Sequence, residues 1–599
     1  MRIKTIYILF TLAGLASLAA CSDKRDDTPR VISDTAVIEV AGNIPESRTA
    51  MYDEPVTVGD DDADGVAAVD TRAVLIDDMR SVHWTDDDKV VLWASNPSGS
   101  NGINGEQFGY YTQTAANTAR FTGNIKVSDD EYRCVAVYPV PARTDGRRVT
   151  YTLPDRQDGT YRSELDIMSS DPSSGKLVES TGSEGVHLTM HHMCHALQIR
   201  IPEGRNRWGK PVTRLLVEFP REVAGDISFE VSEESGAGSV TLTNGKRTIE
   251  LDLSKAPFDE RTDGSPRYLW VFITAGAING DISFTPLFED GYCAETLSAT
   301  VDREFRGGRV TPIDLTISAK EQPVTWIDFT VDYTQLGEAV NTLTVTAPEN
   351  ARFRGDKQSE TVGASADGKF SVGYYAKFYH DAFKGAQVNL VYDSTHAIVT
   401  GTATLPASPV TDGRNTMTVK APYLLEENFD SALDFTNNLD KTTDNPDGIS
   451  LTEANLSGWT AARVQVHAKN YVQIAVRHET VAEYPGRLDT PQLPIKPAFT
   501  DGIKISVTFN AYRTNSYVYV TCGKVSGTDP LKGNGGVNDG IKIEPKDNDF
   551  ESYNIQLSGF TSQNRISWVV QRTYSFSGNG WISRTWYTYF DNIRVSIAQ

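Results

Sequence analysis

The chain has 599 residues, with 79 acidic against 57 basic side chains and a formal net charge of −22. Nucleic-acid binding is excluded as a main role, because phosphate contacts need clustered lysine and arginine. The length allows about four domains of roughly 150 residues each. The five cysteines show neither metal-site spacing nor a dense disulfide framework. A bridge between Cys134 and Cys194 would suit an oxidising compartment, but free buried thiols are favoured.

The N-terminus has the pattern of an export signal. Arg2 and Lys4 precede a short apolar run, 6–18, and small residues then lead to Cys21. The run is shorter than the ~20 residues that a membrane span needs. Leu18-Ala19-Ala20-Cys21 resembles the lipobox of bacterial lipoproteins, and the polar segment 22–27 resembles a tether to the outer face of the outer membrane. This resemblance implies acylation (palmitate and related chains) at Cys21 and attachment to the outer membrane through that lipid.

Strand signals dominate the rest of the chain. The predicted strands are short, alternating, rich in β-branched or aromatic residues and bounded by Gly, Asn, Asp or Pro. They include 37–40, 90–93, 132–138, 197–201, 215–219 and 268–273. Short helices are expected only near 335–339 and 378–383. The pattern predicts an all-β chain of tandem β-sandwiches.

Changes in composition and turn chemistry suggest where the domains end. We expect a signal peptide and lipobox at 1–21, a tether at 22–35, sandwiches at 36–200 and 201–320, an immunoglobulin-like spacer at 323–422 and a jelly roll at 424–599. The spacer shows no candidate site.

The first half resembles the fimbrillin family, the pilin-like lipoproteins that build surface pili in Bacteroides-type bacteria. An ordered set of features over about 31–320 carries this resemblance: a first strand at 36–40, Ser47-Arg48-Thr49, the W-x-x-x-D-x-V pattern of 84–90, Phe121-Thr122-Gly123, Val135-Ala136-Val137-Tyr138-Pro139 and the histidine-rich 188–197.

The resemblance implies two pilin-like (transthyretin-like) sandwiches and pilin partners that bind by strand exchange. In the family, cleavage after an arginine removes the first strand. Here Arg48 and Thr49 would flank the cleaved bond, in a polar segment that a protease could reach, and Arg30 is a second, less favoured position. The alternative is that Arg48 is only a turn residue and the strand stays.

Two segments invite a metal interpretation. His191, His192, Cys194 and His195 are ligand types that zinc accepts, but alternation along a strand sends them to opposite faces. A structural strand at the seam between the first two sandwiches is therefore favoured. The acidic run 60–65 begins like a calcium loop, but its twelfth position is Thr71 in place of the expected glutamate. We expect no metal.

The last domain resembles the galactose-binding-like jelly rolls of secreted Bacteroides proteins, through its opening, 427–430, and its close, 589–595. Alternation predicts that Trp586, Thr588 and Phe590 share one face and that Tyr587 and Tyr589 share the other. The expected ligand-binding residues lie on one aromatic loop. They are Tyr574, Phe576, Ser577, Asn579 and Trp581.

Catalytic motifs do not appear: the chain has nine histidines but no GxSxG, HExxH or phosphate-binding glycine loop. We therefore expect a protein that is not an enzyme and needs no cofactor. The predicted function is cell-surface adhesion as a tip or accessory subunit of a Bacteroides-type pilus, with glycan or protein recognition by the jelly roll. The alternative is an outer-membrane glycan-capture lipoprotein that does not polymerise.

Overall fold

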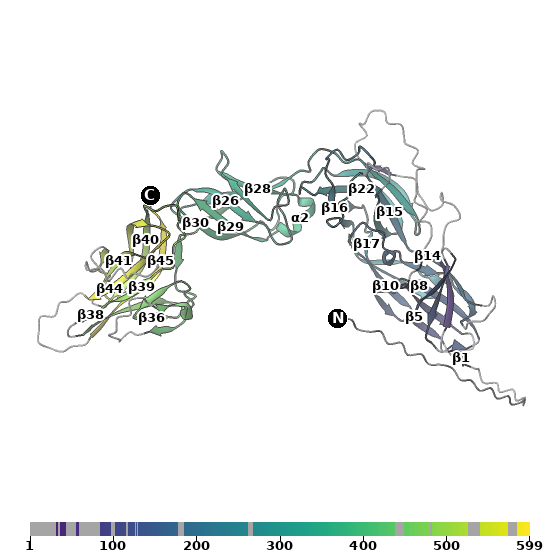
Figure 1. The fold of residues 1–599 in the computed structure, drawn as a ribbon, viewed down its shortest axis with the longest axis horizontal. Coiled ribbons are helices and arrows are strands. Elements are labelled where there is room, and N and C mark those ends of the chain that lie inside the picture. Colours follow the sequence, from purple (N-terminus) through teal and green to yellow (C-terminus); the bar gives the residue numbers. More distant parts are fainter. Residues whose placement is uncertain are drawn as a thin grey trace, which may run out of the picture.

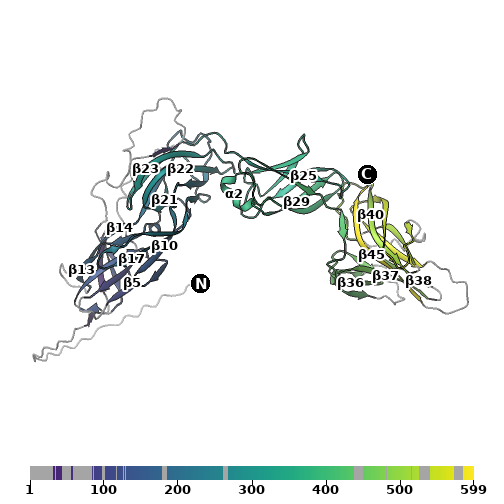
Figure 2. The same ribbon diagram turned by 180° about the vertical axis from the view of Figure 1, so that it is seen from behind.

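The protein is described from a computed structural model. The structure describes residues 31–33, 36–42, 56–58, 84, 86–96, 102–115, 118–125, 127–128, 130–177, 185–260, 267–437, 449–479, 482–514, 516–524, 540–572 and 584–598. These residues form packed β-sheets that follow one another along an arch (Figure 1). The same order is visible from behind (Figure 2), so the chain runs from one end of the arch to the other.

The N-terminal end of the arch is built on an eight-stranded sheet. Its order is β12 (Met168–Ser170), β14 (His187–His192), β2 (Ala36–Gly42), β6 (Thr118–Gly123), β5 (Ile103–Ala115), β4 (Lys89–Ser95), β8 (Glu131–Tyr138) and β13 (Ser173–Lys176). A second sheet packs against it, in the order β18 (Gly236–Ala237), β17 (Ala224–Ser232), β10 (Arg148–Leu153) and β9 (Arg143–Asp145), with β19 (Thr241–Lys246) on β17. Strands β1 (Val31–Ser33) and β7 (Val127–Ser128) form a separate pair.

Two further sheets enclose the next core. One has the order β21 (Leu269–Thr274), β15 (Cys194–Arg200), β24 (Val310–Leu315) and β3 (Val56–Val58). The other has the order β11 (Arg156–Gln157), β20 (Thr248–Asp252), β16 (Val212–Glu218), β22 (Gly276–Phe288) and β23 (Leu297–Phe305). Because β3 precedes β4 in sequence but pairs with β24, the chain interleaves these sheets with those of the first sandwich.

The middle of the arch is a smaller sandwich. Its sheets are β28 (Lys369–Tyr374), β25 (Thr325–Asp332) and β31 (Arg414–Lys420) on one side, and β27 (Ser359–Gly363), β26 (Val340–Thr346), β29 (Gln387–Ser394) and β30 (Ile398–Thr404) on the other. Helix α2 (Ala376–Phe383) follows β28 and buries Tyr379 and Phe383. Among the described residues, two short 3₁₀ helices also occur, at Ser163–Leu165 and Thr452–Ala454.

The C-terminal end is a two-sheet sandwich. One sheet has the order β33 (Phe435–Asn437), β36 (Val464–His467), β37 (Tyr471–Glu479), β45 (Arg584–Ile597), β40 (Ile503–Arg513) and β43 (Glu551–Phe560), with β32 (Leu425–Glu427) on β45 and β38 (Ala482–Tyr484) on β37. The other has the order β34 (Ile449–Ser450), β35 (Thr460–Ala462), β39 (Gly486–Asp489), β44 (Asn564–Arg572), β41 (Ser516–Lys524) and β42 (Ile541–Ile543).

Apolar side chains from facing sheets fill these sandwiches, as strand alternation requires. Trp93 and Val135 lie in the core between the first two sheets, and Leu197 and Phe284 lie in the core of the next pair. One continuous core runs from Ile327 in the middle sandwich to Ile597 at the end of the chain. The prediction of an all-β chain of tandem sandwiches is confirmed.

Local predictions have mixed outcomes. The helix expected near 378–383 is present as α2, but 335–339 is a turn followed by a bend. Leu336 is buried there, and Ile597 donates its backbone N–H to the Leu336 carbonyl across 2.8 Å. Within the described residues, no helix combines the length and apolarity of a bilayer span.

Candidate functional site

The N-terminal strand β2 lies inside the eight-stranded sheet and has a partner on each side. It runs parallel to β14, with Glu39 opposite His187, and antiparallel to β6, with Ile38 opposite Phe121. A strand so placed contributes to two hydrogen-bond ladders at once. Removal of β2 would therefore expose backbone donors and acceptors on both neighbours, which is the geometry that accepts an added strand.

Side chains also secure β2. Ile38 is 1% exposed and packs in the core of this sheet. On the other face, Glu39 Oε2 lies 2.8 Å from His187 Nδ1, and the Thr114 hydroxyl donates to Glu39 Oε1 across 2.8 Å. A replacement strand would need an apolar residue at the Ile38 position and a polar or acidic one at the Glu39 position.

The histidine-rich segment is two strands instead of the single strand that the sequence predicts. Strand β14 ends at His192, and β15 begins at Cys194 in a different sheet. At the break, Met193 donates its backbone N–H to the Ile167 carbonyl across 2.7 Å. The segment thus crosses from the first sandwich to the second, and the alternation expected of one strand is interrupted there.

The histidines of this segment have separate partners. His191 Nε2 lies 2.8 Å from Asp171 Oδ2, and His192 Nδ1 lies 2.7 Å from Asp166 Oδ1. Burial disfavours the charged form of His192, but the Asp166 carboxylate outweighs that effect and raises the pKa of His192. The result is a hydrogen-bonded histidine–aspartate pair at the seam, and the raised pKa favours its charged form.

His195 is fully buried and uses both ring nitrogens. Nδ1 lies 2.9 Å from the Arg306 carbonyl, which can only accept, so Nδ1 donates. Nε2, 2.9 Å from the Thr311 hydroxyl, then accepts in the neutral ring. Across the part of the chain that the structure describes, no three His, Cys, Asp or Glu side chains gather as metal ligands would.

The four described cysteines are free thiols. Burial raises the pKa of Cys134 to about 12, and burial with the nearby Asp166 charge raises the pKa of Cys194 to about 12. Thiols held this far from ionisation are poor nucleophiles and poor metal ligands. Cys134 and Cys194 therefore behave as packing residues in two separate cores.

The residues predicted for lipidation, cleavage and ligand binding lie outside the described residues. This holds for Cys21, Arg48 and Thr49 at the N-terminus, for the acidic run 60–65, and for the aromatic loop with Tyr574, Phe576, Ser577, Asn579 and Trp581. Their lipidation, cleavage and ligand contacts stay predictions.

The predicted division of faces along β45 is confirmed. Thr588 and Phe590 are fully buried, and Trp586 packs against the core. Tyr587 and Tyr589 therefore lie on the outer face of the sheet. The sequence does not indicate that Tyr471 lies beside Tyr589 on this face, or that Phe550 lies beside Tyr471, because strands far apart in sequence bring these rings together.

Comparisons with known proteins bear on the first half of the chain. The model of the fimbrillin-like family matches residues 71–251. No curated protein matches the sequence.

Three solved structures illustrate the proteins to which this chain is structurally similar. A candidate cell adhesion protein from Bacteroides uniformis is 15% identical, with 40% of this chain and 91% of that chain covered and a TM-score of 0.29. A second, from Bacteroides ovatus, is 12% identical, with 50% and 96% covered and a TM-score of 0.30. A streptococcal ancillary pilin is 11% identical, with 64% and 99% covered and a TM-score of 0.18.

The family assignment rests on the sequence match and applies to the residues that it covers. The match runs from before β4 into β20, and it includes the histidine strand β14 and the features noted between residues 84 and 197, but not the first strand or Ser47-Arg48-Thr49. Residues 71–251 are therefore a fimbrillin-like region of this chain.

Proposed function

We propose that this chain is a cell-surface adhesion protein that serves as a tip or accessory subunit of a pilus. The fimbrillin-like match of residues 71–251 supports a place at the cell surface and in pilus assembly. The observation that carries the proposal furthest is the position of β2, a strand near the N-terminus that is paired on both sides within its sheet. Its role is structural and adhesive, without catalysis or cofactor.

In this proposal the chain first reaches the outer membrane as a lipoprotein acylated at Cys21. Each buried methylene of an acyl chain contributes about 0.8 kcal/mol, so several chains hold a protein in the membrane stably. Cleavage after Arg48 then removes β2, and the slot between β6 and β14 receives a strand from a neighbouring subunit. Backbone hydrogen bonds supply the affinity of such strand addition, and the side-chain positions supply its register.

Two variants test the assembly step. Arg48→Ala should block maturation and keep the protein out of filaments, whereas Arg30→Ala, a matched loss of one arginine on the other side of β2, should mature normally. Filament incorporation is read by immunoblot of sheared surface material. Normal incorporation of Arg48→Ala would refute cleavage at this bond.

The anchoring step has its own test. Cys21→Ala should leave the protein soluble in the periplasm or the medium, because no acyl chain can then be attached. Membrane fractionation that is unchanged from wild type would remove the lipid anchor from the proposal.

Recognition is assigned to the C-terminal sandwich, with the loop residues Tyr574, Phe576 and Trp581 as ring contacts and Ser577 and Asn579 as hydrogen-bonding groups. If Trp581 contacts a ligand, Trp581→Ala should abolish retention on a glycan array and leave the melting temperature nearly unchanged. If Trp581 packs in a core, the same change should cost roughly 3–5 kcal/mol and unfold the domain, and the loop would not be the binding site.

The second candidate function is glycan capture by a lipoprotein that never polymerises. The aromatic outer face of the C-terminal sandwich favours it. An intact lipid anchor on cells together with polysaccharide affinity would support this function over pilus assembly.

A further inference from the structure

Four aromatic rings form a cluster on the outer face of the sheet that contains β45. We call it the tyrosine platform; it consists of Tyr471 on β37, Tyr512 on β40, Tyr589 on β45 and Phe550 just before β43. The rings of Tyr512 and Tyr589 stack at 4.0 Å between centroids with an interplanar angle of 8°. Tyr471 meets Tyr589 edge-on at 5.3 Å, and Phe550 meets Tyr512 edge-on at 4.6 Å.

The platform does not contribute to the core of this sandwich. The residues that follow or precede its tyrosines along the strands, Val472, Ala511 and Phe590, point the other way and are fully buried. The platform rings are absent from that core, and Phe550 is 38% exposed. Aromatic surface gathered on one outer face has no packing role inside the sandwich, and such patches mark interaction sites.

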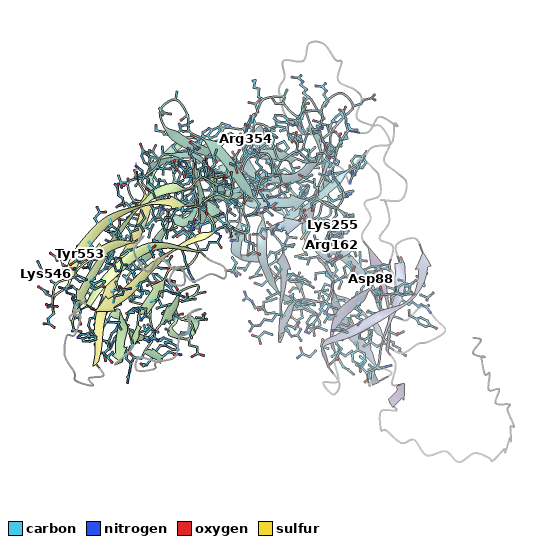
Figure 3. All side chains as sticks on the ribbon, turned by 60° about the vertical axis from the view of Figure 1, so that its left-hand side comes forward. Asp88, Arg162, Lys255, Arg354, Lys546 and Tyr553 are labelled. Carbon is cyan, nitrogen blue, oxygen red and sulfur yellow. The ribbon has the colours of Figure 1, made fainter. Side chains whose placement is uncertain are left out.

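The surroundings of the platform are polar but internally paired. His467 Nε2 lies 3.1 Å from Gln473 Oε1, and the His467 ring lies 4.5 Å from that of Tyr471. At the opposite side, Lys546 Nζ lies 2.9 Å from Glu551 Oε1, and the Tyr553 hydroxyl donates to Glu551 Oε2 across 2.8 Å. Figure 3 shows Lys546 and Tyr553 together at this edge.

We propose that the tyrosine platform binds a neutral saccharide, whose pyranose rings stack their C–H faces on the tyrosines. This proposal rests on the recognition role proposed above for the C-terminal sandwich, and it names the ligand class and a second surface on that sandwich. A neutral ligand fits because the nearby lysine is already paired with a glutamate, Lys546 with Glu551.

Tyrosine suits a saccharide better than an aliphatic surface would. Its ring is apolar while its hydroxyl is polar, so one side chain stacks on a sugar and also bonds to a sugar hydroxyl. Burial and the neighbouring Tyr589 and Tyr471 raise the pKa of Tyr512, so its hydroxyl keeps its proton. An anionic bilayer is a poorer partner, because the whole chain carries a formal charge of −22.

The opposite sheet of the same sandwich offers a matched control. Tyr517 and Tyr519 lie on β41, where the alternate residues Val518 and Val520 are buried in the core, so both tyrosines lie on the outer face of that sheet. Their rings meet edge-on at 5.4 Å. Tyr519→Ala therefore removes an aromatic ring from the surface of the same domain but leaves the platform intact.

The test uses the full chain without its signal peptide, immobilised hexasaccharides of gluco, manno, galacto and xylo configuration, and a sulfated polysaccharide as a charged probe. Wild type should bind at least one neutral probe. Tyr471→Ala and Tyr512→Ala should each weaken that binding about tenfold or more, which corresponds to about 1.4 kcal/mol. Tyr519→Ala should bind as wild type does.

Tyr512→Phe is the control for misfolding of Tyr512→Ala, because it keeps the stacked ring and removes only the hydroxyl. It should retain the melting temperature and lose part of the affinity. The inference is overturned if wild type binds no neutral probe, if it binds only the sulfated one, or if Tyr519→Ala weakens binding as much as Tyr512→Ala. Incorporation into filaments, measured on the same variants, separates this failure from failure of the pilus proposal.

Discussion

At the scale of single residues, a largely buried histidine–aspartate pair lies at the seam between the first two sandwiches. His192 and Asp166 lie 2.7 Å apart, and Tyr161 donates its hydroxyl to the other Asp166 oxygen across 3.0 Å. The pair joins the last residue of β14 to the loop that precedes β12. It therefore ties two chain segments at the point where the chain changes sheet.

This pair predicts a pH dependence. Because the pKa of His192 is raised on folding, its contribution is fully present below the ordinary value of about 6.5 and is lost as pH rises through the raised value. His192→Gln should cost roughly 1.5–3 kcal/mol at pH 5.5 and clearly less at pH 8.5. Thermal melts at the two pH values give the comparison.

His191→Gln is the control for that experiment. His191 also pairs with an aspartate, Asp171, but its side chain is 41% exposed and that of Asp171 is 73% exposed. An exposed pair contributes little, so this variant should melt close to wild type at both pH values. An equal loss at pH 5.5 and pH 8.5 for His192→Gln would contradict the ion-pair account.

One glycine fixes the contact between the second and middle sandwiches. Gly291 has a φ of +74°, and a Cβ there would run into the backbone of Gly355 and Asp356 from the middle sandwich. The Gly355 N–H donates to the Gly291 carbonyl across 3.0 Å. A side chain at position 291 would push these backbones apart.

Gly204 supplies a comparison with nearly the same backbone angle. Its φ is +73°, and a Cβ there meets nothing within 4 Å. Gly204→Ala should cost only the backbone strain of about 1 kcal/mol, whereas Gly291→Ala should cost more and loosen the junction. Chemical denaturation of both variants measures the difference. An equal loss of unfolding free energy in the two variants would mean that the junction accommodates a Cβ at position 291 without strain.

At the scale of elements, strand content was the most predictable feature. Residues 90–93 and 132–138 lie within β4 and β8, and the helix expected at 378–383 lies within α2. Alternation also assigned the faces of β45 correctly, with Phe590 inward and Tyr589 outward. These features are local, so a run of residues suffices to indicate them.

Features that depend on distant partners were not predictable. The apolar period near 335–339 suggested a helix, but Leu336 instead anchors a turn against Ile597, more than 250 positions away. The histidine segment breaks at Met193, whose backbone N–H donates to the Ile167 carbonyl instead of to a neighbouring strand of the same sheet. The tyrosine platform gathers from β37, β40 and β45, and no single segment carries its pattern.

The strand β2 predicts a measurable consequence of its removal. A protein cut after Arg48 and stripped of its first strand should bind a synthetic peptide of residues 34–43, because the ladders on β6 and β14 are then open. Ile38→Asp in that peptide should abolish binding, since position 38 lies in the core. A Glu39→Gln peptide, changed at a partly exposed position, should still bind. Binding of the Ile38→Asp peptide would contradict this use of the slot.

At the scale of the whole molecule, specific side-chain contacts join the second sandwich to the middle one. Arg354 donates two hydrogen bonds to the Glu321 carboxylate, at 2.5 and 2.8 Å, and stacks over the Tyr292 ring at 4.7 Å. The Tyr375 hydroxyl donates to the same carboxylate across 2.6 Å. Arg354 is labelled at this bend in Figure 3.

Helix α2 adds to the same junction. Arg214 on β16 donates to the Tyr379 hydroxyl across 2.8 Å and lies over the Phe378 ring at 4.7 Å. Lys377 pairs with Glu218 across 2.7 Å. The helix thus joins the middle sandwich to the second one.

These contacts predict one preferred arched shape in solution. Small-angle scattering of wild type should fit a single arched form, and Arg214→Ala combined with Arg354→Ala should broaden the distribution of end-to-end distances without a change in β content. Lys377→Ala alone, which removes only an exposed pair, should keep the wild-type profile. A wild-type profile as broad as that of the double variant would contradict a fixed junction.

Maturation of the N-terminus is the central claim for the whole molecule, since it separates a pilus subunit from a permanently anchored lipoprotein. The most direct test is the N-terminal residue of the protein purified from surface filaments, read by mass spectrometry of its first peptide. The account predicts a start at Thr49 with no lipid attached. An acylated start at Cys21, with β2 still part of the chain, would contradict it.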